Sequence, residues 1–254
     1  MMEFSYKLLG LPDVASAHGR QVDSFIVYIH WLMVALFVGW LIYFLFTLYH
    51  FRSHRVPKAN YFGVRHHFSS YIELGIVAFE AVLLLFFAIP LWGDVVGKLP
   101  SESETTVIQV VGQQFAWHAR YGGPDGKFGA QDMKFVKTDN LFGVDPNDPA
   151  GKDDVQVLNE IHAPVKKPVL CHVSSMDVIH SFRVAAMRAT QDAIPGMRIP
   201  LWFEPNKIGT YQIYCAQLCG NGHAAMAAGR LVVESQEDYD KWLASKVGAA
   251  TSFE

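Results

Sequence analysis

Charged residues are missing from a long stretch near the N-terminus of this chain. Residues 24–51 contain no Lys, Arg, Asp or Glu and consist mainly of Phe, Leu, Ile, Val and Trp. This absence excludes a solvated surface helix, and the run is long enough to cross a bilayer. A second apolar run, residues 71–92, carries only Glu73 and Glu80. The sequence therefore predicts two transmembrane helices, at about 24–51 and 71–92.

Cysteine is also scarce, and the outer portion of the chain has no excess of positive charge. The chain has three cysteines and no Cys-x-x-Cys-His sequence, which excludes a covalently attached haem c. Residues 94–254 hold 15 basic and 19 acidic side chains, a net charge of −4. A mildly acidic outer portion argues against nucleic acid and permits a basic protein partner.

The first apolar run also resembles a signal peptide in position, but its core is far longer than the usual ~7 to 15 residues.

Basic residues indicate the orientation of the two helices in the membrane. The segment between the two runs holds four of them and the N-terminal tail two: Arg52, Arg55, Lys58 and Arg65, against Lys7 and Arg20. By the positive-inside rule that segment is a cytoplasmic loop. We expect a multi-pass protein of the bacterial inner membrane with both termini in the periplasm.

From residue 104 the sequence changes to short runs rich in β-branched and aromatic residues, separated by Gly, Pro, Asn and Asp. Seven runs are typical of strands: 105–111, 155–161, 169–174, 179–185, 199–203, 209–214 and 228–233. Successive strands without an intervening helix indicate a β-sandwich or barrel. An elaborated loop is expected over 122–154, and a short C-terminal helix, capped by Ser235, over 235–246.

The predicted organisation has two parts. Residues 1–93 form an irregular external N-terminal segment followed by the helix pair and its cytoplasmic loop. Residues 94–254 form a periplasmic β-domain. The fold class is thus a membrane-anchored α+β protein.

A group of potential metal ligands lies near the C-terminus. Cys215, Cys219, His223 and Met226 fall within the segment Tyr-Cys-Ala-Gln-Leu-Cys-Gly-Asn-Gly-His-Ala-Ala-Met. Thiolate, imidazole and thioether are the soft or borderline ligands that select copper. Two alternatives stay open: a disulfide between the two cysteines in an oxidising compartment, and zinc, for which Met is a poor ligand. The isolated His180 is a further candidate ligand.

Two thiolates exceed what a single-copper site needs, which is one thiolate, two imidazoles and a weak axial Met. The simplest use of both sulfurs is to bridge two coppers, each completed by one imidazole. Met226 and a backbone oxygen would then be weak outer ligands. A closed site of this kind favours electron transfer over chemistry on a bound molecule.

Cys-x-Gln-x-Cys-x3-His-x2-Met, with Ser174-Ser-Met-Asp-Val-Ile-His180-Ser-Phe and Asp192-Ala-Ile-Pro-Gly196 upstream, strongly resembles subunit II of haem-copper cytochrome c oxidases. The resemblance covers nearly the whole chain and implies two helices followed by a cupredoxin-like Greek-key sandwich. It implies a binuclear copper A centre with side-chain ligands His180, Cys215, Cys219, His223 and Met226, and with Gln217 as a ligand through its backbone carbonyl.

The resemblance also implies a function and partners. A c-type cytochrome would donate electrons to copper A, which passes them to haem in subunit I, where oxygen is reduced and protons are translocated. Subunit I would hold the haems and copper B, and subunit III is a further expected partner. This chain would be a non-catalytic electron-transfer subunit of the enzyme.

Other positions are carried over by alignment. Glu73 stands where many members have the glutamate at the entrance of a proton channel. The segment Gly112-Gln-Gln-Phe-Ala-Trp117 places Phe115 where many members carry the Trp that accepts the electron, with Trp117 as a second candidate. Gln217 replaces a Glu whose carboxylate helps hold magnesium in the family, and a neutral amide would bind that ion more weakly.

Two further substitutions concern the donor. Met176 and Arg120 stand where acidic docking residues are common in the family. If both lie on the docking surface, electrostatic steering should be weak. We therefore expect a c-type cytochrome that is membrane-tethered, fused or bound in a complex.

Two alternative functions remain at this stage. A copper A subunit of a nitric oxide reductase would carry the same ligand motif. A membrane-anchored copper-delivery protein could use Cys-x3-Cys and a distant His, but such proteins usually have one anchor and a thioredoxin-like α/β pattern.

Overall fold

The computed structural model describes residues 2–58, 61–63 and 66–247. It divides into two compact units, Met1–Leu11 with Gln21–Asp94, and Pro12–Arg20 with Val95–Glu254. Arg65 of the expected cytoplasmic loop lies outside the described residues. The division follows the change in composition between apolar helices and short β-branched runs.

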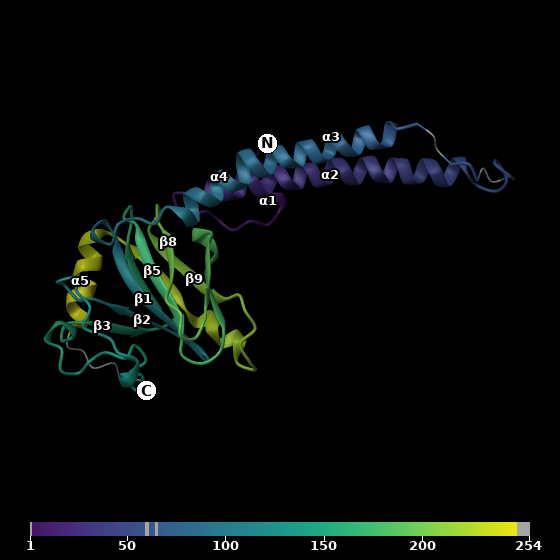
Figure 1. Cartoon of the computed structure of the whole chain (residues 1–254). Coiled ribbons are helices and arrows are strands. Elements are labelled where there is room, and N and C mark those ends of the chain that lie inside the picture. Colours follow the sequence, from purple (N-terminus) through teal and green to yellow (C-terminus); the bar gives the residue numbers. More distant parts are fainter. Residues whose placement is uncertain (1, 59–60, 64–65, 248–254) are drawn as a thin grey trace. The chain divides into compact units, whose positions relative to one another are not determined.

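The first unit is helical (Figure 1). α1 spans Met2–Leu8 and α2 spans Gly19–His50, while a second long helix over Phe68–Gly97 contains α3, Phe68–Leu83, and α4, Ile89–Trp92. The two long helices, of 32 and 30 residues, are long and apolar enough to cross a membrane. Both predicted helices are present: the first begins five residues before the expected bound and ends one residue before it, and the second extends beyond its expected bounds at both ends. The expectation of an irregular N-terminal segment is wrong for α1 and for the first turn of α2.

The second long helix changes its winding before a proline. Leu84–Ala88 form a π-helical turn directly ahead of α4, which contains Pro90. Proline has no backbone N–H and its ring crowds the carbonyl four residues earlier, here that of Phe86. A wider turn relieves this crowding and lets the helix continue.

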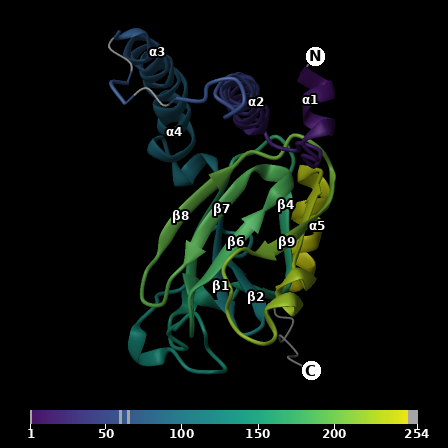
Figure 2. The same cartoon turned by 90° about the vertical axis from the view of Figure 1, so that its right-hand side faces the viewer.

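The second unit is a sandwich of two five-stranded mixed sheets (Figure 2). One sheet has the order β3 Val155–Leu158, β2 Ala116–Tyr121, β1 Thr106–Gln113, β5 Val169–Ser175, β8 Ile199–Phe203. The other has the order β4 Glu160–Pro164, β10 Arg230–Glu234, β9 Gly209–Cys215, β6 His180–Val184, β7 Ala189–Ala193. The predicted two-helix and sandwich architecture is confirmed. The thioredoxin-like pattern of a copper-delivery protein is not found in the described residues.

Side chains from both sheets fill one core. Its largest fully buried members include Trp117, Phe182, Phe203, Ile108 and Ile213. They come from alternate positions of five different strands, as expected when each strand turns one face inward. α5, Gln236–Lys246, begins at Ser235, whose hydroxyl accepts the N–H of Asp238 at 3.1 Å. The predicted capped helix is therefore confirmed.

Three features of the strands differ from expectation. β2 and β7 were not predicted, and the single run expected over 155–161 is divided between β3 and β4. Asn159 separates these two strands with a φ of 57°. This left-handed conformation suits Asn and interrupts the run where the chain passes from one sheet to the other, which propensity alone does not reveal.

The segment Pro12–Arg20 belongs to the sandwich unit, although its last two residues begin α2. The N–H of Ala15 donates to the carbonyl of Ala186 at 2.8 Å, and that of Ala17 donates to the carbonyl of Glu204 at 3.0 Å. Val14 and Ala15 are buried. These long-range contacts explain why periodicity gave no signal for an ordered segment here.

Arg120 is fully buried, so its expected place on a docking surface is wrong. Its guanidinium pairs with the carboxylate of Asp154, at the end of the long loop, and donates to the carbonyl of Gly129 at 3.0 Å. It also donates to the side chain of Gln109 at 3.2 Å. A buried charge needs such partners, and here they fix the loop over 122–154 against β1 and β2.

Candidate metal centre

Neighbouring strands bring the first two potential ligands together. His180 is the first residue of β6 and Cys215 is the last residue of β9. The two strands are antiparallel, with Phe182 opposite Cys215. Because residues two apart on a strand share a face, His180 and Cys215 point to the same side. The register of this one strand pair thus joins residues that are 35 positions apart.

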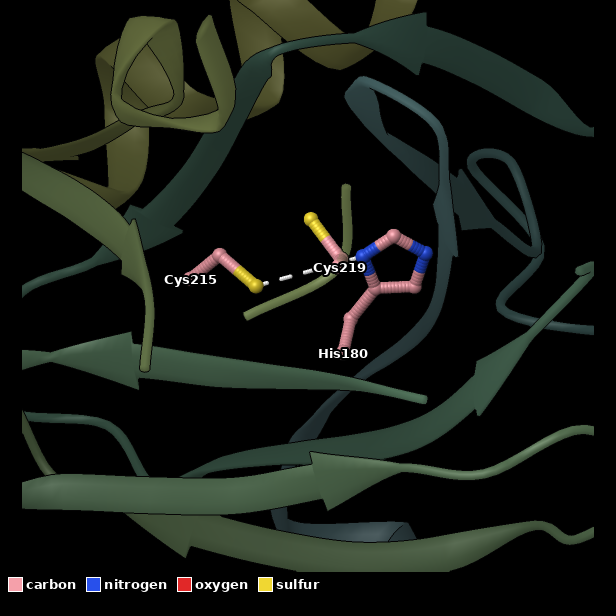
Figure 3. Close-up of side chains that lie close together, drawn as sticks. All are labelled: His180, Cys215 and Cys219. Atoms are coloured by element: carbon pink, nitrogen blue, oxygen red, sulfur yellow. Dashed lines mark hydrogen bonds between the residues drawn. The ribbon is translucent and has the colours of Figure 1, made fainter. Parts of the chain in front are cut away.

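Each cysteine has one imidazole beside it. The Sγ of Cys215 lies 3.9 Å from Nδ1 of His180, and the Sγ of Cys219 lies 3.4 Å from Nδ1 of His223. One ligand atom from each of His180, Cys215 and Cys219 lies within 4.8 Å of the others, as their convergence in Figure 3 illustrates. Both cysteines are free thiols, so the disulfide alternative is not realised.

The two weaker predicted ligands lie close to the same loop. The thiol of Cys215 donates to the backbone carbonyl of Gln217 at 3.0 Å, while the side chain of Gln217 is exposed. Met226 is fully buried within the 3-10 helix His223–Ala228. The backbone carbonyl of Gln217 therefore lies beside the sulfur of Cys215, as the family resemblance implied. The side-chain amide of Gln217 does not take part in this contact.

A carboxylate orients His180. Its Nε2 lies 2.9 Å from Oδ1 of Asp177. An ionised carboxylate only accepts, so Nε2 carries the proton and Nδ1 presents its lone pair on the side of Cys215. Burial acts to raise the pKa of Asp177, but hydrogen bonds from the N–H of Gln114, from His180 and from the N–H of Val178 outweigh it and lower that pKa. Asp177 is therefore ionised and able to hold the imidazole.

The thiol of Cys219 is in an apolar environment. Burial, followed by the proximity of Cys215, raises its pKa to about 11. The thiol therefore keeps its proton at neutral pH unless a cation is bound, and metal binding would release it. The protonated thiol is a poor nucleophile, but a thiophilic metal can displace its proton.

Glycines let the ligand loop lie directly on an aromatic ring. A Cβ on Gly222 would overlap the ring of Phe115, and one on Gly220 would lie 3.1 Å from its Cζ. Gly220 also has a φ of 138°, which is open mainly to glycine. On the opposite side of the site, a Cβ on Gly112 would lie only 2.9 Å from Cδ2 of His180. The glycines in the sequence thus allow close approach around the ligands.

The two candidates for electron input differ in position. Phe115 is partly buried and contacts the ligand loop. Trp117 is fully buried, with its ring centroid 6.0 Å from that of His180 and 5.2 Å from that of Phe182. Trp117 therefore cannot contact a donor directly.

Two other predicted positions are not among the candidate metal ligands. Met176 is partly buried against a small apolar cluster of Val111, Leu141 and Phe142. Glu73 lies on α3, in the helical unit, and is exposed in this chain together with Glu80.

The sequence analysis assigned no role to Asp177 or to Gln114. The backbone N–H of Gln114 donates to Oδ2 of Asp177 at 2.8 Å, and its side-chain amide donates to the carbonyl of Cys219 at 2.6 Å. The position of Gln114 directly before Phe115 was the available sign that it lies near the site. Its hydrogen bonds, however, join residues 63 and 105 positions apart, and a local sequence pattern does not reveal such contacts. The donor set as a whole fits copper: it is soft, nearly closed to water and scaffolded by strands.

Replacing Gly222 with Ala should disturb the ligand loop. The added Cβ overlaps the ring of Phe115, so the loop must move away and copper affinity should fall by about tenfold. A competition titration with a chelator measures this. Combining Gly222→Ala with Phe115→Ala should restore affinity, because the obstructing ring is gone. Gly93→Ala, which meets nothing within 4 Å, is the control. Unchanged affinity in Gly222→Ala would refute this account of the loop.

Comparison with known proteins agrees with this geometry. Residues 106–235 match the family described as cytochrome c oxidase subunit II, periplasmic domain. The chain is 30% identical to an alternative cytochrome c oxidase subunit 2 of Bradyrhizobium diazoefficiens, over 87% of this chain and 79% of that protein. It is 32% identical to a probable cytochrome c oxidase subunit 2 of Rickettsia bellii, over 92% of this chain and 81% of that protein.

Among solved structures, the periplasmic domain of subunit II of cytochrome oxidase from Bradyrhizobium japonicum is similar. It has 29% identity and a TM-score of 0.43, and the match covers 59% of this chain and 96% of that one. The family match spans more than half of the present chain, and the relatives extend it through the helices. The chain therefore belongs to the cytochrome c oxidase subunit II family.

Proposed function

We propose that this chain is the electron-input subunit of a respiratory haem-copper oxidase. It would accept electrons from a c-type cytochrome at a binuclear copper A centre and pass them to haem in subunit I. The observation that carries the proposal is the pairing of two buried cysteines with one imidazole each, Cys215 with His180 and Cys219 with His223.

Copper A would be held by His180, Cys215, Cys219, His223 and Met226 and by the carbonyl of Gln217. When bound, it supplies a one-electron carrier shared between two metals. The chain supplies rigidity: the strand ends fix one Cys–His pair, and Asp177 fixes the ring of His180. Burial excludes water from the thiols, which keeps reorganisation small when charge arrives.

Phe115 is the proposed point of electron input. Its ring is partly buried and lies against the loop that carries Cys219 and His223. An aromatic contact of this kind joins the outer surface to the ligands through packed atoms. Trp117 would act from inside, by supporting His180.

The donor would dock mainly through apolar contacts. Val178, Ile179 and Leu218 flank the ligands and are 38%, 47% and 78% exposed. The buried Arg120 cannot be part of the docking surface, so the proposal of apolar docking rests on these three exposed side chains. They suit a c-type cytochrome that is tethered to the membrane or bound in a complex, where electrostatic capture is not needed.

The membrane helices would bind the catalytic subunit. They are almost entirely unburied within this chain, and α3 carries Glu73 and Glu80 seven residues apart on one face. Carboxylates in an apolar helix require protein or water beside them. Subunit I, with haem and copper B, is the proposed partner there, and subunit III a second; oxygen reduction and proton translocation would take place in that assembly.

Magnesium has little support. The side chain of Gln217 is an exposed neutral amide. Among the described His, Cys, Asp and Glu residues, the one group close enough to hold an ion is His180, Cys215 and Cys219, which suits a soft metal.

Copper loading of the purified full-length chain tests the centre. We expect two coppers per chain and an electron paramagnetic resonance spectrum with hyperfine splitting from both nuclei. Cys219→Ser should lose this spectrum, whereas Cys171→Ala should keep it, because Cys171 is buried away from the ligands in β5. One copper per chain, or an electron localised on one nucleus, would contradict the proposal. Turnover of oxygen rather than nitric oxide by the assembled complex separates the two enzyme classes.

Salt dependence tests the donor. If docking is mainly apolar, the kcat/KM for a c-type cytochrome should change less than about tenfold between low and moderate ionic strength, below the range of strong electrostatic steering. Reduction by a small neutral reductant is the control and should not respond to salt. A steeper loss with the cytochrome would show that charge governs docking.

Glu73→Gln tests the role in proton uptake. The substitution keeps the side-chain size and removes the ionisable group. We expect oxidase turnover and proton uptake to fall at least about tenfold if Glu73 passes protons in the limiting step. Glu104→Gln, in an exposed turn ahead of β1, is the matched control. Unchanged proton uptake in Glu73→Gln would refute the role.

A further inference from the structure

Two separate chain segments must be held together at the metal centre. One carries Asp177 and His180, and the other is the loop with Cys215, Cys219 and His223. Strand pairing fixes Cys215 to β6, but Cys219 lies beyond the end of β9. Its position relative to His180 therefore needs contacts outside the sheets.

Gln114 supplies contacts to both segments from a third. Its backbone N–H donates to Oδ2 of Asp177 at 2.8 Å, and the other oxygen of that carboxylate lies 2.9 Å from Nε2 of His180. Its side-chain Nε2 donates to the carbonyl oxygen of Cys219 at 2.6 Å. One residue is thus connected by hydrogen bonds to the orienting group of His180 and to the backbone of Cys219.

The packing around Gln114 leaves the loop few other positions. A Cβ on Gly220 would lie 2.8 Å from Nε2 of Gln114 and 3.1 Å from Cζ of Phe115, so the loop rests closely on both side chains. The ring of Phe115 limits movement toward β1, and the amide of Gln114 limits rotation of the Cys219 peptide. Packing and hydrogen bonding therefore act on the same short segment.

We propose that Gln114 is a positioning residue that holds the segments of His180 and Cys219 in register and so maintains the geometry of the metal centre. The effect on a copper spectrum rests on the proposed function. The hydrogen bonds of Gln114 are present without any metal. Gln114 does not coordinate the metal; it acts through the backbone of Cys219 and through Asp177.

Gln114→Met isolates the side-chain contact. Met has a similar length but no donor, and the backbone N–H to Asp177 is retained. Gln113→Met is the matched control, because the side chain of Gln113 contacts His118, at 3.0 Å, and not the ligand loop. Thermal unfolding of the full-length variants checks that all fold. Gln114→Glu is a second variant that keeps the size and replaces the donor with an acceptor.

The metal-free readout is amide hydrogen exchange in the loop. The N–H of His223 donates to the carbonyl of Gly220 at 3.1 Å, and that of Ala225 donates to the carbonyl of Gly222 at 2.9 Å. Loss of one hydrogen bond that holds this loop should speed exchange of these amides about 2- to 10-fold in Gln114→Met. Gln113→Met should exchange at the wild-type rate.

The copper readout separates this role from the proposed function. If the wild-type chain binds paired copper, Gln114→Met should lose it to a chelator about tenfold faster and show altered hyperfine splitting. Wild-type exchange rates and copper retention in both Gln114 variants would overturn the inference and leave the proposed function intact. Equal effects in Gln113→Met would overturn it as well. Failure of the wild-type chain to bind paired copper would refute the proposed function, while the exchange rates would still decide the role of Gln114.

Discussion

The antiparallel pairing of β6 with β9 is the constraint on which the metal centre depends. It places Cys215 opposite Phe182, and therefore on the same face as His180, at a separation that backbone hydrogen bonds determine. Side-chain flexibility has little part in it, since His180 is fully buried and Phe182 and Trp117 pack beside it. The first Cys–His pair is thus as rigid as the sheet itself. The second pair lies on a loop and needs additional contacts.

Those contacts come from the end of β1. Gln114 and Phe115 approach the loop from one side, and the absence of side chains at Gly220 and Gly222 allows close contact. The same sheet positions the long excursion over 122–154, through the buried pair of Arg120 and Asp154. A single sheet therefore supports both the loop that carries candidate metal ligands and the long loop over 122–154.

The sequence predicted the parts that have a local signature. Long runs with few or no charged residues predicted the two helices. Cys215, Cys219, His223 and Met226 stand out as candidate ligands because soft donors rarely lie so close together in a sequence, whereas His180 is isolated and has no such signal. Long-range contacts had no such signature. Alignment with the family placed Arg120 among docking positions, whereas in this chain it is buried and paired with Asp154. The segment at 12–20 looked irregular because carbonyls more than 150 residues away satisfy its backbone. Gln114 likewise acts through partners 63 and 105 residues away.

The connection between β9 and β10 has a wider consequence. These strands are antiparallel neighbours, and every candidate ligand except His180 and Cys215 lies on the connection between them. A hairpin connection can change in length and composition without altering the pairing of the strands that it joins. The pairing of β6 with β9 is therefore independent of the length of the loop that carries the other candidate ligands. Changes confined to that loop alter the donors beside His180 while the two sheets keep their register, so the frame of the site and its set of donors can vary separately.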